Sequence, residues 1–190
     1  MIVLKLPAGS GTIQTIQAAV RAGARAVFLQ PEDVFNGSRA PPGSIAGQVY
    51  SSLMEPVVGD WKPELRSVTW WGKPGSFGYG RTALALEHPF LEGLPRGVAF
   101  DARPLYQRVV PRYTWVLDGQ PSGLRFSRAV VQSTVHVDMP YTSDLFSFAC
   151  GKGDVVLNTL RLAEHLDSDP DADRILENIL LSVTRNRRGR

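Results

Sequence analysis

The feature that most constrains the fold is a continuous apolar run at Ala26–Gln30 (AVFLQ), which Pro31 closes. A run of this kind is typical of a strand that is buried on both faces of a parallel sheet. The preceding segment, Thr12–Ala22, predicts a short amphipathic helix, and Gly23 is suited to end it in a left-handed turn. The apolar face of this helix consists of Ile13, Ile16, Ala19 and Val20. A helix followed by a buried strand predicts α/β layering.

The C-terminal region predicts an antiparallel hairpin followed by a long helix. Two β-rich runs, Leu145–Ala149 and Asp154–Thr159, flank a tight glycine turn. Asp169 is suited to cap the helix, and Pro170 fits its first position. An apolar stripe then recurs at helical spacing: Ala172, Ile175, Leu176, Ile179, Leu180 and Val183. We therefore predict an α/β domain with a mostly parallel sheet, a C-terminal antiparallel hairpin and a final helix.

Length and charge favour one domain that binds no nucleic acid. The chain has 190 residues, of which 43% are hydrophobic, and it can therefore bury one core. The net charge is +3, but the C-terminal end holds four arginines: Arg185, Arg187, Arg188 and Arg190. The rest of the chain has no basic excess of the kind that binds a phosphate backbone. We predict a single domain over residues 1–184 and a basic disordered tail over residues 185–190.

The chain has one cysteine, Cys150, which limits its redox and metal chemistry. One thiol can form neither an intrachain disulfide nor a cysteine-based zinc site. Met1–Leu6 is too short for a signal sequence or a membrane span, so we expect no membrane partner and favour the cytoplasm. Phe148 and Lys152 stand where an activated cysteine commonly has glycines. Cys150 is therefore expected to lie at the end of a hairpin strand.

An aromatic cluster is the first candidate binding site. Trp70, Trp71 and Tyr79 adjoin or lie within a glycine-rich loop, Gly72–Gly80. Sugars stack on aromatic faces in concave sites, so the cluster is a candidate carbohydrate site. The alternative is that these side chains pack in the core and hold the loop in place.

Polar residues form a second candidate site. His136 and Asp138 fall on one face of a predicted strand, a geometry that a general base and its orienting carboxylate can use. Glu87 and His88 precede an apolar turn and are the other polar candidates. The alternatives are an open strand face for the first pair and structural packing for the second.

No motif predicts catalysis, a metal or a cofactor. The chain contains neither a GxSxG elbow nor a phosphate loop. Its three histidines, His88, His136 and His165, are far apart and form no metal-binding spacing. We therefore expect no catalytic residue, no metal and no cofactor in this chain.

Two segments carry a resemblance to a known family. Gly151–Leu180 (GKGDVVLNTLRLAEHLDSDPDADRILENIL) resembles the end of family 2 glycoside hydrolases of the β-galactosidase-like kind. There, a glutamine-amidotransferase-like (flavodoxin-like) domain closes the protein. His88–Pro95 (HPFLEGLP) is similar to a segment of amidotransferase-like domains and of trehalose-utilisation-type (ThuA-like) domains. The resemblance implies a three-layer flavodoxin-like domain that lacks the amidotransferase residues.

The resemblance also implies a function without catalysis in this chain. In such glycosidases the catalytic carboxylates belong to a separate barrel. We therefore expect a non-catalytic accessory domain of a carbohydrate-active protein, which acts in oligomerisation or in shaping a neighbouring active site. Its partners would be other glycosidase domains or a second copy of the chain, with carbohydrate as a candidate ligand. An intact flavodoxin-like domain begins with more elements than Met1–Leu6 can supply, so the domain is expected to be N-terminally truncated.

The alternative is a stand-alone ThuA-like sugar-binding protein or enzyme with a pocket near Trp70, Trp71 and Tyr79. An accessory domain predicts an exposed apolar patch. A stand-alone enzyme predicts a pocket that combines convergent polar groups with a perturbed titratable residue. A plain interaction module would instead bury the aromatic cluster.

Overall fold

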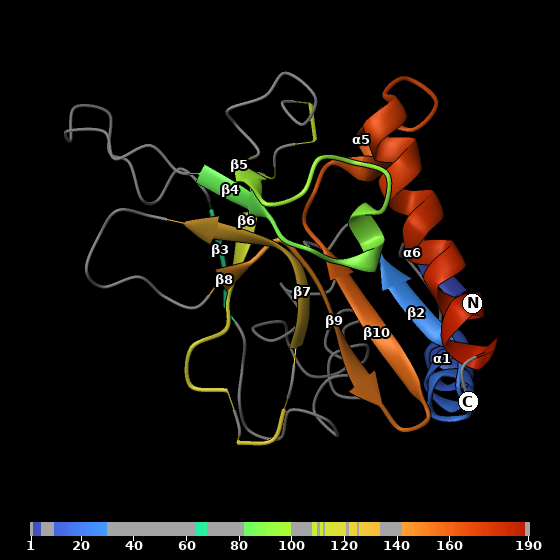
Figure 1. The fold of residues 1–190 in the computed structure, drawn as a ribbon. Helices are drawn as coiled ribbons and strands as arrows, with labels where there is room; N and C mark the ends of the chain where they lie inside the picture. Colours follow the sequence, from blue (N-terminus) through green and yellow to red (C-terminus); the bar gives the residue numbers. More distant parts are fainter. Residues whose placement is uncertain are drawn as a thin grey trace.

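The computed structural model describes residues 2–4, 10–29, 64–67, 82–99, 108–109, 111, 113–120, 122–124, 126–133 and 142–188. These residues form a mixed α/β structure (Figure 1). The elements are β1 (Ile2–Leu4), α1 (Ser10–Arg21), β2 (Arg25–Phe28), β3 (Glu64–Ser67), β4 (Thr82–Ala85), the 3-10 helix η4 (Pro89–Leu91), β5 (Val98–Ala99), β6 (Tyr113–Val116), β7 (Phe126–Ser133), β8 (Thr142–Ser143), β9 (Leu145–Cys150), β10 (Gly153–Asn158), α5 (Leu162–His165) and α6 (Pro170–Arg188).

The main sheet is mixed, which corrects the prediction of a mostly parallel sheet. Its strand order is β1-β2-β10-β9-β7-β4-β5, and only β1, β2 and β10 pair in parallel within the described residues. The other neighbours are antiparallel. A buried apolar run indicates how its own strand is placed in the sheet, but it does not indicate how the other strands pair. The tight turn between β9 and β10 permits antiparallel pairing only. A second antiparallel sheet has the order β3-β6-β8.

The N-terminal helix and strand form as predicted. Ile16 and Val20 of α1 are buried, and Gly23 follows the helix with a φ of 118°. All four residues of β2 are buried, and the strand lies between β1 and β10 in parallel. Both neighbours cover its edges, and both of its faces are covered, which confirms the prediction from the apolar run.

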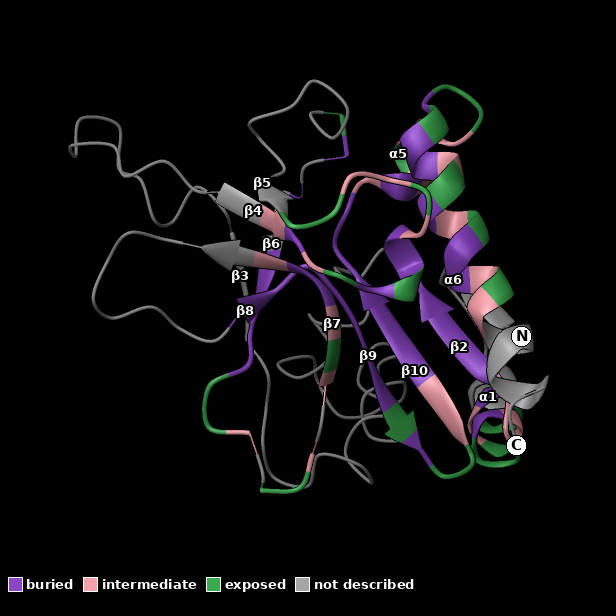
Figure 2. Cartoon of the chain, in the orientation of Figure 1, coloured by how far each residue is buried: buried purple, intermediate pink, exposed green. Residues whose placement is uncertain are grey.

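The C-terminal hairpin and helix also form as predicted. The Oδ1 of Asp169 accepts a hydrogen bond from the Asp171 N–H at 2.9 Å, so Asp169 caps α6. Ile175 and Ile179 are fully buried on the side of α6 that faces the sheet. Figure 2 shows α6 buried along one side, and strands β2, β9 and β10 mostly buried.

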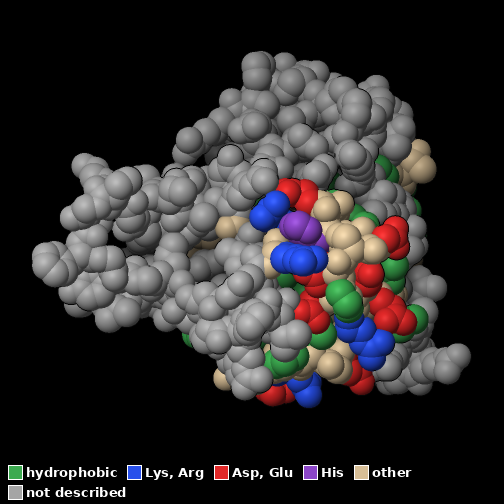
Figure 3. Space-filling view, turned by 90° about the horizontal axis from the view of Figure 1, so that it is seen from above, with side chains coloured by type: hydrophobic (Ala, Val, Ile, Leu, Met, Phe, Trp, Pro, Cys, Tyr) green, Lys and Arg blue, Asp and Glu red, His purple; other side chains and the backbone are tan. Residues whose placement is uncertain are grey.

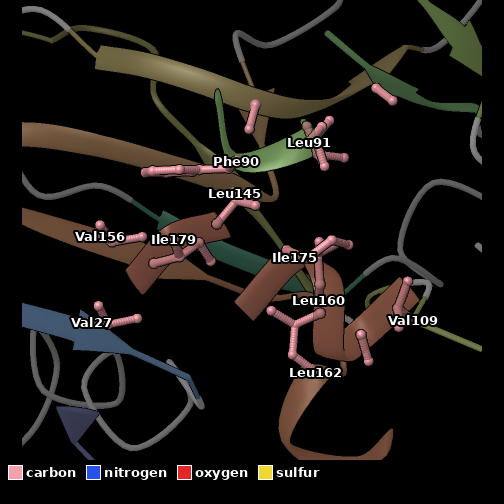
Figure 4. Close-up of a cluster of buried hydrophobic side chains, with 14 residues drawn as sticks. Val27, Phe90, Leu91, Val109, Leu145, Val156, Leu160, Leu162, Ile175 and Ile179 are labelled. Carbon is pink, nitrogen blue, oxygen red and sulfur yellow. The ribbon is translucent and has the colours of Figure 1, made fainter. Parts of the chain in front are cut away.

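The core joins α6 to the strands beneath it. In one buried cluster the strands supply Val27, Leu145 and Val156, and α6 supplies Ile175 and Ile179 (Figure 4). Phe90 and Leu91 belong to the same cluster, so the turn at His88–Pro95 packs on the core as its alternative interpretation predicted.

The observed elements differ from the predicted ones at the C-terminal end and can be compared only in part near Ser67. Helix α6 continues to Arg188, beyond the predicted domain end at residue 184 and into the segment predicted as a disordered tail. Arginine is a good helix former and is favourable at a helix C-terminus, where the dipole is negative. The run Ser67–Trp71 (SVTWW) also predicts a strand. Its first residue, Ser67, is the last residue of β3, and its other residues lie outside the described residues. No helix in the described part of the chain is both long and apolar enough to cross a membrane.

Candidate functional site

A pocket of about 610 Å³ opens between η4, α6 and the sheet. Its polar floor comes from strand positions next to the core. Side chains on one face of a strand recur every second residue, and on three strands a polar residue stands two positions from a core residue: Arg25 and Val27 on β2, Asp154 and Val156 on β10, Ser147 and Leu145 on β9. The sheet face therefore changes from apolar to polar along one line, and the pocket lies over its polar part.

The floor is also defined by strand register. Asp154 lies opposite Arg25 on the neighbouring parallel strand, and Ser147 lies opposite Ser127 on the neighbouring antiparallel strand. Arg25 and Asp154 stand at the amino ends of their strands. Open α/β sheets usually bind substrates outside the carboxyl ends of parallel strands, so this pocket occupies the opposite end.

Arg25 ties the pocket floor to α6. Its side chain is 6% exposed and forms a two-pronged ion pair with Asp154, in which Nε donates to Oδ1 at 2.7 Å and Nη2 donates to Oδ2. Its Nη1 donates to the carbonyl oxygen of Ile179 at 3.1 Å and to Oγ of Ser182 at 2.5 Å. The guanidinium also lies 5.5 Å from the ring centre of Phe90. Most of its donors are therefore committed within the protein.

His88 is held in one tautomer. Its Nδ1 accepts a hydrogen bond from the Phe90 N–H at 3.1 Å, as the cap of η4. A backbone N–H can only donate, so Nδ1 carries no proton and the neutral ring is protonated at Nε2. Nε2 lies 2.8 Å from Oγ of Ser127 and therefore donates to it.

This tautomer decides what the pair can do chemically. A histidine that activates a serine must present a lone pair to the hydroxyl proton. Here the ring presents a proton instead, so His88 cannot act as the base for Ser127. Burial and the nearby Arg25 guanidinium lower the pKa of His88 to about 4, so the ring is neutral at pH 7.

The pocket lining has nearly balanced charge. It carries the basic Arg25 and Arg96 and the acidic Glu87, Glu92 and Asp154. Asp154 pairs with Arg25, and Glu87 pairs with Arg96 at 3.0 Å. With His88 neutral, the lining residues carry two positive and three negative side chains. Figure 3 shows basic, acidic and histidine side chains gathered on one face of the molecule.

The wall of the pocket forms where η4 meets α6. Asn178 of α6 donates from Nδ2 to the carbonyl oxygens of Phe90, at 3.2 Å, and Glu92, at 2.8 Å. Phe90 meets the His88 ring edge-on, with 4.3 Å between ring centres. These contacts fix the turn that carries Glu87 and His88 against the helix.

The structure brings together some of the predicted site residues. Glu87 and His88 both line the pocket. Trp70, Trp71 and Tyr79 lie outside the described residues, as do His136 and Asp138. The described residues contain no group of acidic, histidine and cysteine side chains that could hold a metal. A scan against protein-family models and a search of curated proteins found no match for the chain.

The sequence interpretation missed most of the pocket floor. Arg25, Ser127, Ser147 and Asp154 were not recognised, because none of them makes a motif with its sequence neighbours. A usable signal was present in two of them: Arg25 directly precedes an apolar run, and Asp154 begins another. A charged residue on the buried face of a strand requires a partner.

Cys150 lies outside the pocket lining and ends β9, as predicted. Its thiol is buried, and burial raises its pKa, although the positive charge of Arg21 partly opposes this effect. Because the thiolate is the reactive form, we expect alkylation by iodoacetamide at pH 8 to be at least about 10-fold slower in the native protein than in guanidinium. Mass spectrometry over time measures both rates, with Cys150→Ser as the background control. Equal rates would contradict the prediction.

Proposed function

We propose that the chain is a non-catalytic accessory domain of a carbohydrate-active protein, β-galactosidase-like, and that its pocket binds a small polar ligand without transforming it. One observation carries the non-catalytic part of the proposal. The Phe90 N–H occupies Nδ1 of His88, so the ring donates to Ser127 and cannot deprotonate it. The pocket thus has hydrogen-bonding groups but no activated nucleophile among the described residues.

The contact between the two resembling segments supports the family part of the proposal. Asn178 lies in the segment Gly151–Leu180, and its two acceptors lie in His88–Pro95. Residues 86 and 88 positions apart in sequence therefore meet in one wall of one pocket. We further propose the three-layer flavodoxin-like arrangement, because β2 is buried on both faces and α6 packs on the face that carries Val27.

A second candidate is a stand-alone ThuA-like enzyme or sugar-binding protein. The observation that favours it is the pocket itself, which combines convergent polar groups with a histidine of lowered pKa. Within the described residues, Leu181 is the one large apolar side chain that is exposed, so these residues show no broad apolar patch for a partner.

Parallel binding and turnover assays separate the two candidates. The purified chain would be incubated with a panel of polar small molecules and followed by thermal shift, and with 4-nitrophenyl glycosides and esters to detect hydrolysis. We expect at least one ligand to raise the melting temperature, and no hydrolysis above the buffer rate. Hydrolysis that disappears in both Ser127→Ala and His88→Gln, but not in Ser168→Ala, would overturn the non-catalytic proposal. Ser168 is an exposed serine outside the pocket lining and serves as the matched control.

The accessory role has its own test in the coding sequence. If the chain belongs to a larger glycosidase, the reading frame adjoining it should encode a barrel-sized region with paired catalytic carboxylates. A stop codon directly before Met1 would contradict the accessory role and favour the stand-alone candidate.

A further inference from the structure

We infer that the ligand of this pocket is an uncharged polyhydroxyl compound, a neutral sugar or polyol, and that the Ser127 hydroxyl donates a hydrogen bond to one of its oxygens. His88 is then a positioning residue, which orients that hydroxyl through Nε2–H. The inference rests on the proposed function and names the ligand class of the same site.

The direction of the hydrogen bonds supports a donor at Ser127. The Phe90 N–H donates to Nδ1, and Nε2–H donates to Oγ of Ser127. A hydroxyl oxygen that accepts such a bond keeps its own proton to donate elsewhere. His88 is 8% exposed whereas Ser127 is exposed, so the hydrogen-bond relay runs from the buried backbone to the pocket surface. Its last group offers a proton to a ligand oxygen.

The charges of the lining argue against an anionic ligand. Arg25 is committed to Asp154, to the Ile179 carbonyl and to Ser182, and Arg96 is paired with Glu87. The Arg25 guanidinium therefore lacks the open fork that captures a carboxylate or a phosphate in two hydrogen bonds. An anion at Arg96 would compete with Glu87 for that guanidinium. The lining also carries three carboxylates, those of Glu87, Glu92 and Asp154, and each of them repels an anion.

The remaining lining suits hydroxyl groups and ring carbons. Ser127 and Ser147 present hydroxyls, and Glu92 presents a carboxylate that can accept a hydrogen bond from a ligand hydroxyl. Pro89 and Leu181 offer apolar contact for the C–H face of a sugar ring. The volume of about 610 Å³ falls within the range of small-molecule sites, roughly 300–1,000 Å³.

Calorimetric titration tests the inference with a charge-matched set of probes. The set is D-glucose, D-galactose, lactose and myo-inositol as neutral probes, with glucose 6-phosphate and glucuronate as anionic ones. We expect the best neutral probe to bind at least about 10-fold more tightly than either anion. Ser127→Ala should weaken its binding by about 10-fold, and Ser168→Ala should leave it unchanged.

Two histidine variants test the positioning role. Asparagine at position 88 can accept the Phe90 N–H as a helix cap, but it is too short to replace Nε2–H, so His88→Asn should keep the fold and weaken binding as Ser127→Ala does. The double variant His88→Asn/Ser127→Ala should bind no more weakly than Ser127→Ala alone, because both changes remove one relay. If the double variant still binds the neutral sugar and its loss of affinity equals the sum of the two single losses, the relay is contradicted.

A pH series completes the test. The charged groups that line the pocket with His88 are Arg25, Glu87, Glu92, Arg96 and Asp154. Because its pKa is lowered to about 4, the His88 ring stays neutral between pH 5.5 and 8.5. Neutral-probe affinity should therefore stay constant over this range. An affinity that falls through pH 6.5 as the pH rises would indicate a cationic histidine and overturn the inference.

The outcomes separate this inference from the proposed function. Tight binding of an anion without hydrolysis would overturn the neutral ligand and leave the non-catalytic pocket standing. Binding of a neutral sugar together with its hydrolysis would overturn the non-catalytic pocket and leave the neutral ligand standing. Failure of every probe to bind at millimolar concentration would overturn both.

Discussion

Asp154→Ala is expected to lower the free energy of unfolding by about 3 kcal/mol or more. The substitution leaves the Arg25 guanidinium, which is 6% exposed, without its carboxylate partner. Removing one member of a buried ion pair typically costs about 3–5 kcal/mol, because the remaining charge stays out of water. Urea unfolding followed by circular dichroism measures the change.

Two further variants isolate the cause. Glu177→Ala removes the acidic member of an exposed pair with Arg174 on α6, and exposed pairs contribute about 0–1 kcal/mol. Replacing both charges, as in Arg25→Met/Asp154→Leu, should recover a large part of the loss, since no buried charge is then left unpaired. If Asp154→Ala and Glu177→Ala destabilise the protein equally, the buried Arg25–Asp154 pair contributes no more than an exposed ion pair, and the expectation is wrong.

Gly153→Ala is expected to be at least as damaging. A Cβ at this position would overlap the carbonyl oxygens of Ala24 and Val20. Val20 lies within α1, and Ala24 lies between α1 and β2. Both oxygens are backbone atoms, so neither can turn away as a flexible side chain would. Overpacking usually costs about 1–3 kcal/mol and occasionally more, and we expect about 3 kcal/mol or more here, measured as the loss in urea unfolding free energy.

The matched control is Gly97→Ala. Gly97 has a φ of +67°, and no described atom lies within 4 Å of the Cβ that would be added. It therefore reports the cost of backbone strain alone, about 1–2 kcal/mol. If Gly153→Ala gives no folded protein while Gly97→Ala does, the expectation is met in its strongest form. Equal stabilities for the two variants would show that the hairpin can move away from Ala24.

Local elements could be predicted because their signals are local. The apolar run in Ala26–Gln30 indicates a strand buried on both faces, and β2 is such a strand. Asp169 and Pro170 mark the start of α6 through capping and a preset φ, which involve neighbouring backbone atoms only. Cys150 lies at the end of β9 for the same reason, since the glycine turn follows it directly.

The pairing of the sheet could not be predicted to the same degree. A strand's sequence indicates which of its faces are buried, but its neighbours depend on how distant segments pack. Strand β10 lies between β2 and β9, parallel to one and antiparallel to the other, although more than 120 residues separate it from β2. The prediction of a mostly parallel sheet was wrong for this reason.

Sequence patterns alone predicted α1, β2, the hairpin of β9 and β10, and α6 with its cap, and they included Glu87 and His88 among the candidate site residues. The contacts of His88 with Ser127, of Arg25 with Asp154 and of Asn178 with the turn at His88–Pro95 could be found only in the folded structure. The difference arises from the sequence distance over which each kind of interaction acts. Capping and periodicity act over a few residues, whereas these contacts join residues 39, 129 and 86 positions apart. The tautomer of His88 likewise depends on which groups the fold brings to its two nitrogens, and on that tautomer depends the distinction between a binding pocket and a catalytic one.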